Sequence, residues 1–266
     1  MVLAGQVRLA GILNVTPDSF SDGGRFGSVA EAVTHALEMI RSGIDIIDVG
    51  GESTRPGAAP VSAEDEIGRT IPVIKGILEE VPGAVISIDT YKSSVAEAAL
   101  NAGAKIVNDI SGGSFDTGMW DVVAEKKVPY ILMHTSGTPA EMQQKTGYIN
   151  VVDDVLEWLL KRAEAAKKAG VAEVIIDPGI GFGKTPDQNL QLISSISKFR
   201  GRGYQVLIGL SRKSFLGKAL GYDLKERDLP GSYFEFFCAM NGADIIRTHN
   251  TGNALIYRRI AESLHV

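Results

Sequence analysis

Polar or charged residues lie at the ends of eight short apolar stretches of this sequence, and their types indicate what chemistry they could do together. Carboxylates and carboxamides can bind the ring N–H and amino groups of a flat, nitrogen-rich heterocycle, while lysine and arginine can hold an anion. We therefore expect one site that combines a slot for a heterocycle with a local positive field. The eight residues are Asn14, Asp48, Asp89, Asn108, His134, Asp177, Lys213 and Arg247.

Asp89, Asn108 and Asp177 are the main candidates for the heterocycle slot, because each ends a predicted strand. Their acceptors and donors could lie in one plane, as recognition of a ring edge requires. Each carboxylate alone could instead cap the helix that follows it, and for Asp109 we expect that role. Three such residues together favour a binding site.

Cationic residues follow the seventh and eighth predicted strands, where α/β-barrel enzymes commonly hold phosphate. They lie in Ser211–Ser214 and in Arg247–Asn250. His134 and His249 also follow strands and are the candidate catalytic histidines. His134 could equally be a buried structural histidine, and the sequence leaves both interpretations open.

Two polar loops could cover a ligand. Residues 14–24 carry one large aromatic residue, Phe20, and we expect this loop to act as a lid, although it could be an ordinary mobile connection. Residues 48–57 contain Arg55 beside Pro56, which stiffens the chain. A planar guanidinium there suits a carboxylate or phosphate, and the alternative is a solvated arginine in a surface turn.

These residues need elements that bring them to one place. Eight apolar, β-branched runs predict strands over 8–13, 44–49, 84–88, 105–107, 128–133, 173–176, 204–210 and 244–246. Helical periodicity lies between them, over 29–41, 63–80, 94–102, 151–169 and 189–199. Strict alternation favours parallel pairing, and eight units predict a (β/α)8 TIM barrel that is a single domain over 1–266. The active site would lie at the C-terminal ends of the strands.

A Rossmann sheet is the main competing fold for such an alternating pattern. The glycine-rich segment Asp177–Thr185 follows the sixth strand rather than the first, and Lys184 stands where the dinucleotide motif needs its last glycine. The segment also fails as a phosphate-binding loop, because Pro178 occupies the place of the first glycine. We interpret it as a turn with another purpose.

Bulk properties exclude several function classes. A net charge of -5 argues against a general nucleic-acid or membrane surface, so any anionic ligand must be held locally. The single cysteine, Cys238, can form no internal disulfide, and Gln6 and Arg8 interrupt the only stretch that could be a signal peptide. No run is long enough to span a membrane, and we expect a cytoplasmic protein.

Four blocks of the sequence resemble the signatures of the dihydropteroate synthase family of pterin-binding enzymes, in order and at the spacing of that family. The resemblance implies a transferase of folate biosynthesis that joins 6-hydroxymethyl-7,8-dihydropterin diphosphate to p-aminobenzoate. It also implies 7,8-dihydropteroate and diphosphate as products and Mg²⁺ as cofactor. The blocks are Asn14–Gly24, Gly51–Gly57, Asp177–Thr185 and Ser211–Ser214.

Site roles follow from the resemblance by position. The implied pterin site comprises Asp89, Asn108, Met133, Asp177, Phe182, Gly209 and Lys213. The implied diphosphate site comprises Asn14, Arg247 and His249, and the implied magnesium ligands are Asn14 and Asp22. The implied p-aminobenzoate site comprises Phe20, Thr54, Arg55, Pro56, Phe182 and Ser214. The implied catalytic residues are Asp89, Asp177, Lys213, Arg247 and His249.

Two features depart from the family pattern. Asn250 stands where the family usually has aspartate, which affects how His249 is oriented. The segment Tyr233–Phe237 is bulkier than the small-residue helix of the family; it is typical of core or of the subunit contact of the implied homodimer. Two alternative functions stay open, a pterin-dependent methyltransferase and a non-catalytic pterin-binding paralogue. The loop at Phe182 has no insertion, which predicts ordinary sensitivity to sulfonamides.

Overall fold

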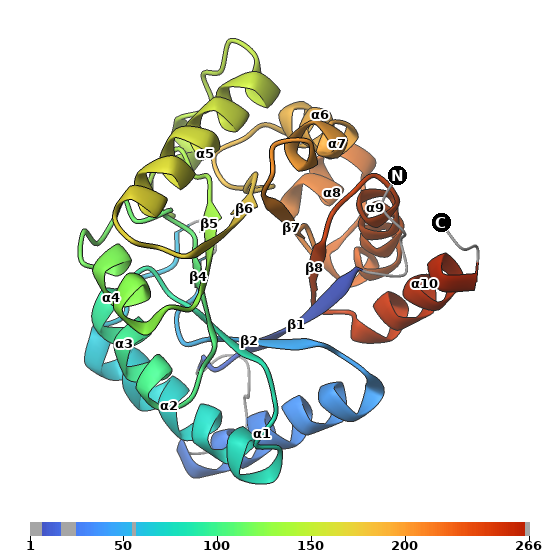
Figure 1. Cartoon of the computed structure of the whole chain (residues 1–266). Coiled ribbons are helices and arrows are strands. Elements are labelled where there is room, and N and C mark those ends of the chain that lie inside the picture. Colours follow the sequence, from blue (N-terminus) through green and yellow to red (C-terminus); the bar gives the residue numbers. More distant parts are fainter. Residues whose placement is uncertain (1–6, 17–24, 55–56, 264–266) are drawn as a thin grey trace.

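Eight parallel strands form one closed barrel in sequence order, with β8 paired to β1. The computed structural model describes residues 7–16, 25–54 and 57–263. Figure 1 shows the helices arranged around the outside of the ring of strands. The predicted TIM barrel is therefore confirmed, whereas a single domain over 1–266 stays a prediction. None of the described helices is long and apolar enough to cross a membrane.

The strands lie close to their predicted positions. They are β1 (Arg8–Asn14), β2 (Ile46–Gly50), β3 (Ile86–Asp89), β4 (Ile106–Asp109), β5 (Pro129–Met133), β6 (Glu173–Asp177), β7 (Gln205–Gly209) and β8 (Ile245–Thr248). The prediction began β2 too early, at Ile44. The Ile44 amide donates instead to the Met39 carbonyl and closes the end of the preceding helix, where Gly43 adopts a positive φ of 103°.

Helices follow the strands around the barrel. They are α1 (Arg25–Ser42), α2 (Ala63–Glu80), α3 (Ser93–Asn101), α4 (Met119–Lys126), α5 (Val151–Lys168), α6 (Pro186–Ser194), α7 (Ile196–Arg200), α8 (Ser214–Leu220), α9 (Asp228–Met240) and α10 (Thr251–Ser263), with short 3₁₀ turns η3 (Met142–Gln144) and η4 (Leu224–Glu226). The single helix predicted over 189–199 is wrong, because α6 and α7 are separate helices on either side of Ser195. The sequence analysis did not identify α4, α8 or α10.

The interior of the barrel is filled at mid-height by one apolar side chain from each of seven strands. These are Ala10, Ile46, Ile106, Ile131, Ile175, Leu207 and Ile245. Because alternate residues of a strand face the same side, the next inward position on each strand is two residues further on, toward the C-terminal mouth. Counting two residues from the plug gives Ile12, Asp48, Asn108, Met133, Asp177, Gly209 and Arg247. The fold thus places a ring of mostly polar positions on top of an apolar plug.

Candidate active site

A cavity with about 290 Å³ of space not occupied by atoms, the open solvent at its mouth included, lies above the plug, at the C-terminal mouth of the barrel. The structure brings all seven residues of the implied pterin site together in its wall, although they come from five different strands and the loops that follow them. The lining residues are Thr54, Asp89, Asn108, Ile110, Met133, Asp177, Phe182, Gly209, Lys213 and Arg247.

Arg247 lies at the centre of a buried ion-pair network. Its Nε is 2.5 Å from Asp48 Oδ2, and one terminal nitrogen is 2.5 Å from Asp89 Oδ2. Asn108 Nδ2 also donates to Asp48, at 3.3 Å. Burial alone would lower the pKa of Arg247, but the two carboxylates raise it, so the guanidinium stays protonated. For Asp89, burial raises the pKa to about 7 although Arg247 opposes the shift.

Asp177 and Lys213 face each other across the cavity. The Asp177 carboxylate accepts a hydrogen bond of 2.7 Å from the Gly179 amide, and burial raises its pKa against the opposing effect of Lys213. The Lys213 ammonium donates to the Ile180 carbonyl and lies 4.6 Å from the centre of the Phe182 ring. Loss of solvation lowers the pKa of Lys213 to about 8. An acceptor and a donor thus lie beside an aromatic wall, as binding of a flat heterocycle requires.

The two candidate histidines lie outside this cavity wall. His134 is 5 % exposed, packs edge-on against Trp158 with ring centres 4.9 Å apart, and has Nδ1 3.1 Å from the Lys184 ammonium. Burial lowers the pKa of His134 to about 2, so its ring is neutral and structural. His249 Nδ1 lies 3.1 Å from the Ser211 hydroxyl. The structural interpretation of His134 is therefore the correct one.

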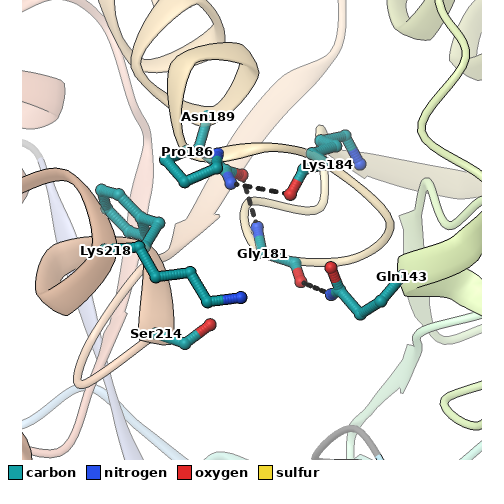
Figure 2. A pocket seen from close by; sticks show the side chains of 8 residues that line it. Gln143, Gly181, Lys184, Pro186, Asn189, Ser214 and Lys218 are labelled. Atoms are coloured by element: carbon teal, nitrogen blue, oxygen red, sulfur yellow. Dashed lines mark hydrogen bonds between the residues drawn. The ribbon is translucent and has the colours of Figure 1, made fainter.

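The residues implied for p-aminobenzoate do not all meet in the described part of the chain. Thr54 and Phe182 line the main cavity, whereas Ser214 lines a neighbouring hollow with Gly181 and Lys218 (Figure 2). The loop of Phe182 separates the two hollows. Four implied ligands of the aromatic acid or of magnesium lie outside the described residues, namely Phe20, Asp22, Arg55 and Pro56.

Asn14 ends β1 and is not among the described residues that line the main cavity. A Cβ placed on Gly50 would lie 3.7 Å from both Asn14 Oδ1 and Asp89 Oδ2, so these two oxygens converge on the same point of the backbone. Gly50 leaves this space open because it has no side chain. The carboxamide of Asn14 thus lies near the Asp89 carboxylate, and its diphosphate and magnesium roles stay predictions.

Two expectations about single residues are corrected by the structure. Asp109 does not cap the following helix, because α4 begins ten residues later; its carboxylate accepts from the Ser111 and Gly113 amides and the Tyr130 hydroxyl. Arg212 supplies no cation to the cavity, because it forms a two-point ion pair with Asp228, at 2.6 and 2.8 Å.

Sequence reasoning missed a second buried network, which joins the loop after β2 to the loop after β3. The Lys92 ammonium bonds to Glu52, and it lies 2.5 Å from Glu66 Oε2. The Tyr91 hydroxyl also donates to Glu52, at 2.7 Å. Glu66 occupies the first turn of α2, where an acidic residue is expected for the helix dipole alone, so the sequence held no signal that it is buried. This network supports the segment that carries Thr54.

Comparison with known proteins adds an independent result. A family model described as pterin binding enzyme matches residues 10–249. A dihydropteroate synthase of Synechocystis is 43% identical over 96% of this chain and 89% of its own length. The solved structure of the Xanthomonas albilineans dihydropteroate synthase with 4-aminobenzoic acid has a TM-score of 0.92 and 37% identity, covering 99% of this chain and 94% of that one.

A second structure of the Xanthomonas enzyme, in complex with 7,8-dihydropteroate, has a TM-score of 0.89 and 34% identity, over 100% of this chain and 96% of that one. The family match covers most of the chain, including every strand end that contributes to the cavity. With the cavity geometry, these findings show that the chain belongs to the pterin binding enzyme family, in its dihydropteroate synthase branch.

Proposed function

We propose that the chain condenses 6-hydroxymethyl-7,8-dihydropterin diphosphate with p-aminobenzoate, which gives 7,8-dihydropteroate and diphosphate. The observation that carries this proposal is the cavity above the barrel plug, where acceptors, donors and an aromatic wall from different segments of the chain converge. Relatives that share the fold over nearly their whole length bind 4-aminobenzoic acid or 7,8-dihydropteroate. No observation favours a methyltransferase or a non-catalytic paralogue.

The pterin would bind edge-on to the carboxylate and amide groups. Asp89, Asn108 and Asp177 would meet its ring N–H, amino and carbonyl groups, because a carboxylate accepts and a carboxamide does both. Lys213 would donate to a ring nitrogen or oxygen, while Met133 and Phe182 pack against the ring faces. Gly209 leaves room for the ring, since it presents no side chain.

The chemical step would begin with departure of diphosphate from the exocyclic carbon. The carbon–oxygen bond breaks with its electron pair on the diphosphate, and positive charge spreads into the electron-rich pterin. Asp177 would stabilise that charge in a site shielded from water. The neutral amine of p-aminobenzoate then forms the carbon–nitrogen bond and loses a proton to diphosphate or solvent. A strong base is not required, which agrees with a site whose cavity wall holds no histidine.

Mg²⁺ stays a proposal, and the chemistry of the donors tests its fit. Among the described residues no three histidine, cysteine or acidic side chains cluster as metal ligands. Mg²⁺ nevertheless prefers oxygen donors, and it often takes only one or two from protein and the rest from phosphate and water. The Asn14 carboxamide oxygen near the Asp89 carboxylate is such a donor, and Asp22 would be the second. A bound Mg²⁺ would supply charge stabilisation for the departing diphosphate.

A homodimer and a cytoplasmic location also belong to the proposal. Helices α9 and α10 lie side by side on one flank of the barrel (Figure 1) and expose large apolar side chains. Several exposed large apolar side chains on neighbouring helices are typical of a protein interface, and the second copy is the implied partner. The exposed residues are Leu229, Tyr233, Phe237, Ile256 and Ile260. A monomer in light scattering at micromolar concentration would contradict the dimer.

The function is tested by incubating the chain with the pterin diphosphate, p-aminobenzoate and Mg²⁺ and by separating the products chromatographically. We expect dihydropteroate and an equal amount of diphosphate. Asp177→Asn should keep the fold and lose most of the rate, because it loses the negative charge that faces the pterin. Tight pterin binding without product would instead indicate a non-catalytic paralogue.

A further inference from the structure

The turn between β6 and α6 is held mainly by side chains, beside one backbone hydrogen bond from the Phe182 amide to the Gly179 carbonyl at 3.1 Å. Within 179–183 every backbone carbonyl accepts a hydrogen bond from a side chain, and the donors come from four different residues. The Lys184 ammonium donates to the Gly179 and Phe182 carbonyls, and the Lys213 ammonium donates to the Ile180 carbonyl. The Gln143 amide donates to the Gly181 carbonyl, and the Tyr148 hydroxyl donates to the Gly183 carbonyl. Figure 2 shows the Gln143 contact, the bond from the Gly181 amide to Asn189 Oδ1 and the bond from Asn189 Nδ2 to the Lys184 carbonyl.

Lys184 is the most deeply buried of these donors, at 3 % exposure. Its ammonium lies 2.9 Å from each of the Gly179 and Phe182 carbonyl oxygens and 3.1 Å from His134 Nδ1. An ammonium has three protons, so these three acceptors use all of them. His134 must then present a lone pair at Nδ1, which agrees with a ring that stays neutral. In Figure 2 the Lys184 side chain points away from Ser214 and Lys218, so it does not reach a ligand there.

Lys184 has no ion-pair partner among the acidic residues in the described part of the chain, and burial lowers its pKa to about 7 although Asp177 opposes the shift. A buried ammonium costs free energy relative to an apolar side chain of similar shape, and methionine has nearly the same length and flexibility. The contacts to two carbonyls of one turn therefore point to a role in the geometry of that turn.

The turn carries a wall of the candidate active site. The Phe182 ring lines the cavity, and Lys213, which also lines it, is bound to the Ile180 carbonyl of the same turn. The Lys213 ammonium has three protons and gives one to Ile180, so it can donate to a pterin while it stays bound to the turn. The shape of the turn therefore sets the positions of both the Phe182 ring and the Lys213 ammonium.

We propose that Lys184 is a positioning residue, which holds Phe182 in the cavity wall and fixes the turn that anchors Lys213. Lys184 supports the carbonyls on both sides of Ile180, the residue to which Lys213 is bound. This inference deepens the proposed function and depends on it. The residue touches neither substrate nor reacting atoms and acts through the turn.

The test compares Lys184→Met with Lys198→Met, which removes an exposed lysine of α7. In Lys184→Met we expect the KM for p-aminobenzoate and the Kd of the pterin from calorimetry to rise roughly tenfold or more, because small displacements of a site wall weaken binding steeply. kcat should change less, and the thermal midpoint should fall, because two carbonyl oxygens and His134 Nδ1 lose a donor. Lys198→Met should match the wild type in all four quantities.

A double-mutant cycle with Phe182→Leu separates positioning from a merely structural role. If Lys184 acts through Phe182, the fold-loss of pterin affinity in the double variant should be clearly smaller than the product of the fold-losses in the two single variants. Unchanged KM and Kd in Lys184→Met would overturn the inference, as would independent losses in the cycle. Should Lys184→Met fail to fold, Lys184→Gln is read by the same criteria. A wild type that makes no dihydropteroate contradicts the proposed function instead.

Discussion

Replacing Arg247 with methionine should destabilise the barrel as well as impair the reaction. The guanidinium is 18 % exposed and lies between Asp48, at 2 %, and Asp89, at 10 %. Both contacts are 2.5 Å ion pairs, and they join three different strands. Methionine keeps most of the apolar stem but leaves two buried carboxylates without their cation.

The expected loss in the free energy of unfolding is about 3–5 kcal/mol, the typical cost of removing one partner from a buried ion pair. A domain has about 5–15 kcal/mol in total, so the variant should unfold at a clearly lower urea concentration. Urea titration followed by the fluorescence of Trp120 and Trp158 measures this difference. Catalysis should fall too, because the implied diphosphate site loses its arginine.

The sign of the pH dependence provides a second check. The pKa of Asp89 is already raised to about 7 by burial while Arg247 opposes the shift, and it must rise further without Arg247. A carboxyl whose pKa is higher in the folded than in the unfolded state loses stability as pH rises between the two values. The free energy of unfolding that Arg247→Met loses relative to the wild type should therefore be larger near pH 8 than near pH 5.5.

A companion substitution tests the cause directly. Adding Asp48→Asn to Arg247→Met removes one of the two uncompensated charges and leaves an oxygen that Asn108 can still bond. We expect the double variant to regain at least about 1 kcal/mol. A single variant within about 1 kcal/mol of the wild type, or a double variant less stable than the single one, would refute the reasoning about the buried charges.

Three further predictions follow from the same cavity. The kcat/KM for the pterin substrate should fall above about pH 8, as Lys213 loses the proton that it donates; a flat profile from pH 6 to 9 would contradict it. Gly179→Ala should cost roughly 3 kcal/mol or more, because φ is +67° and a Cβ would lie 1.9 Å from the His134 carbonyl oxygen. The control Gly203→Ala shares a positive φ but meets no atom within 4 Å, so denaturation should show a smaller loss. A sulfonamide should compete with p-aminobenzoate in the synthase assay, and equal rates with and without an excess of it would refute this.

The position of the site could be predicted because strand alternation fixes it. Once eight parallel strands are recognised, the C-terminal end of each strand must lie at the mouth, and counting two residues on from the plug gives a cavity-lining residue on β4 to β8, as from Ile106 to Asn108 or from Ile175 to Asp177. Lys213 could be placed at the mouth as well, since it lies in the loop that follows β7, four residues after Gly209. The family resemblance then added roles that geometry alone does not give.

Pairing within the site could not be predicted from the sequence. Arg247 looks like a free cation for an anionic ligand, and only the register that places β8 beside β1 and β7 shows that Asp48 and Asp89 already hold it. The burial of Glu66 and Lys184 could not be predicted for a similar reason. Both occupy positions where a charged residue is usually solvated, and burial there is decided by loops that pack over them from distant parts of the chain.

The two ion pairs of Arg247 with carboxylates affect how the diphosphate would be bound. Around the cavity the described cations Arg247 and Lys213 both have partners already, since Lys213 bonds to the Ile180 carbonyl. Binding of an anion with several negative charges would then require either that Arg247 shift toward it or that a further cation arrive with it. Because Asp89 has a raised pKa, uptake of one proton there would release part of the guanidinium charge to the ligand. Calorimetry in buffers of different ionisation enthalpy measures whether a proton is taken up when diphosphate binds, and this distinguishes the two possibilities. Proton uptake that Asp89→Asn abolishes supports the shift of Arg247. Binding without proton uptake favours the arrival of a further cation.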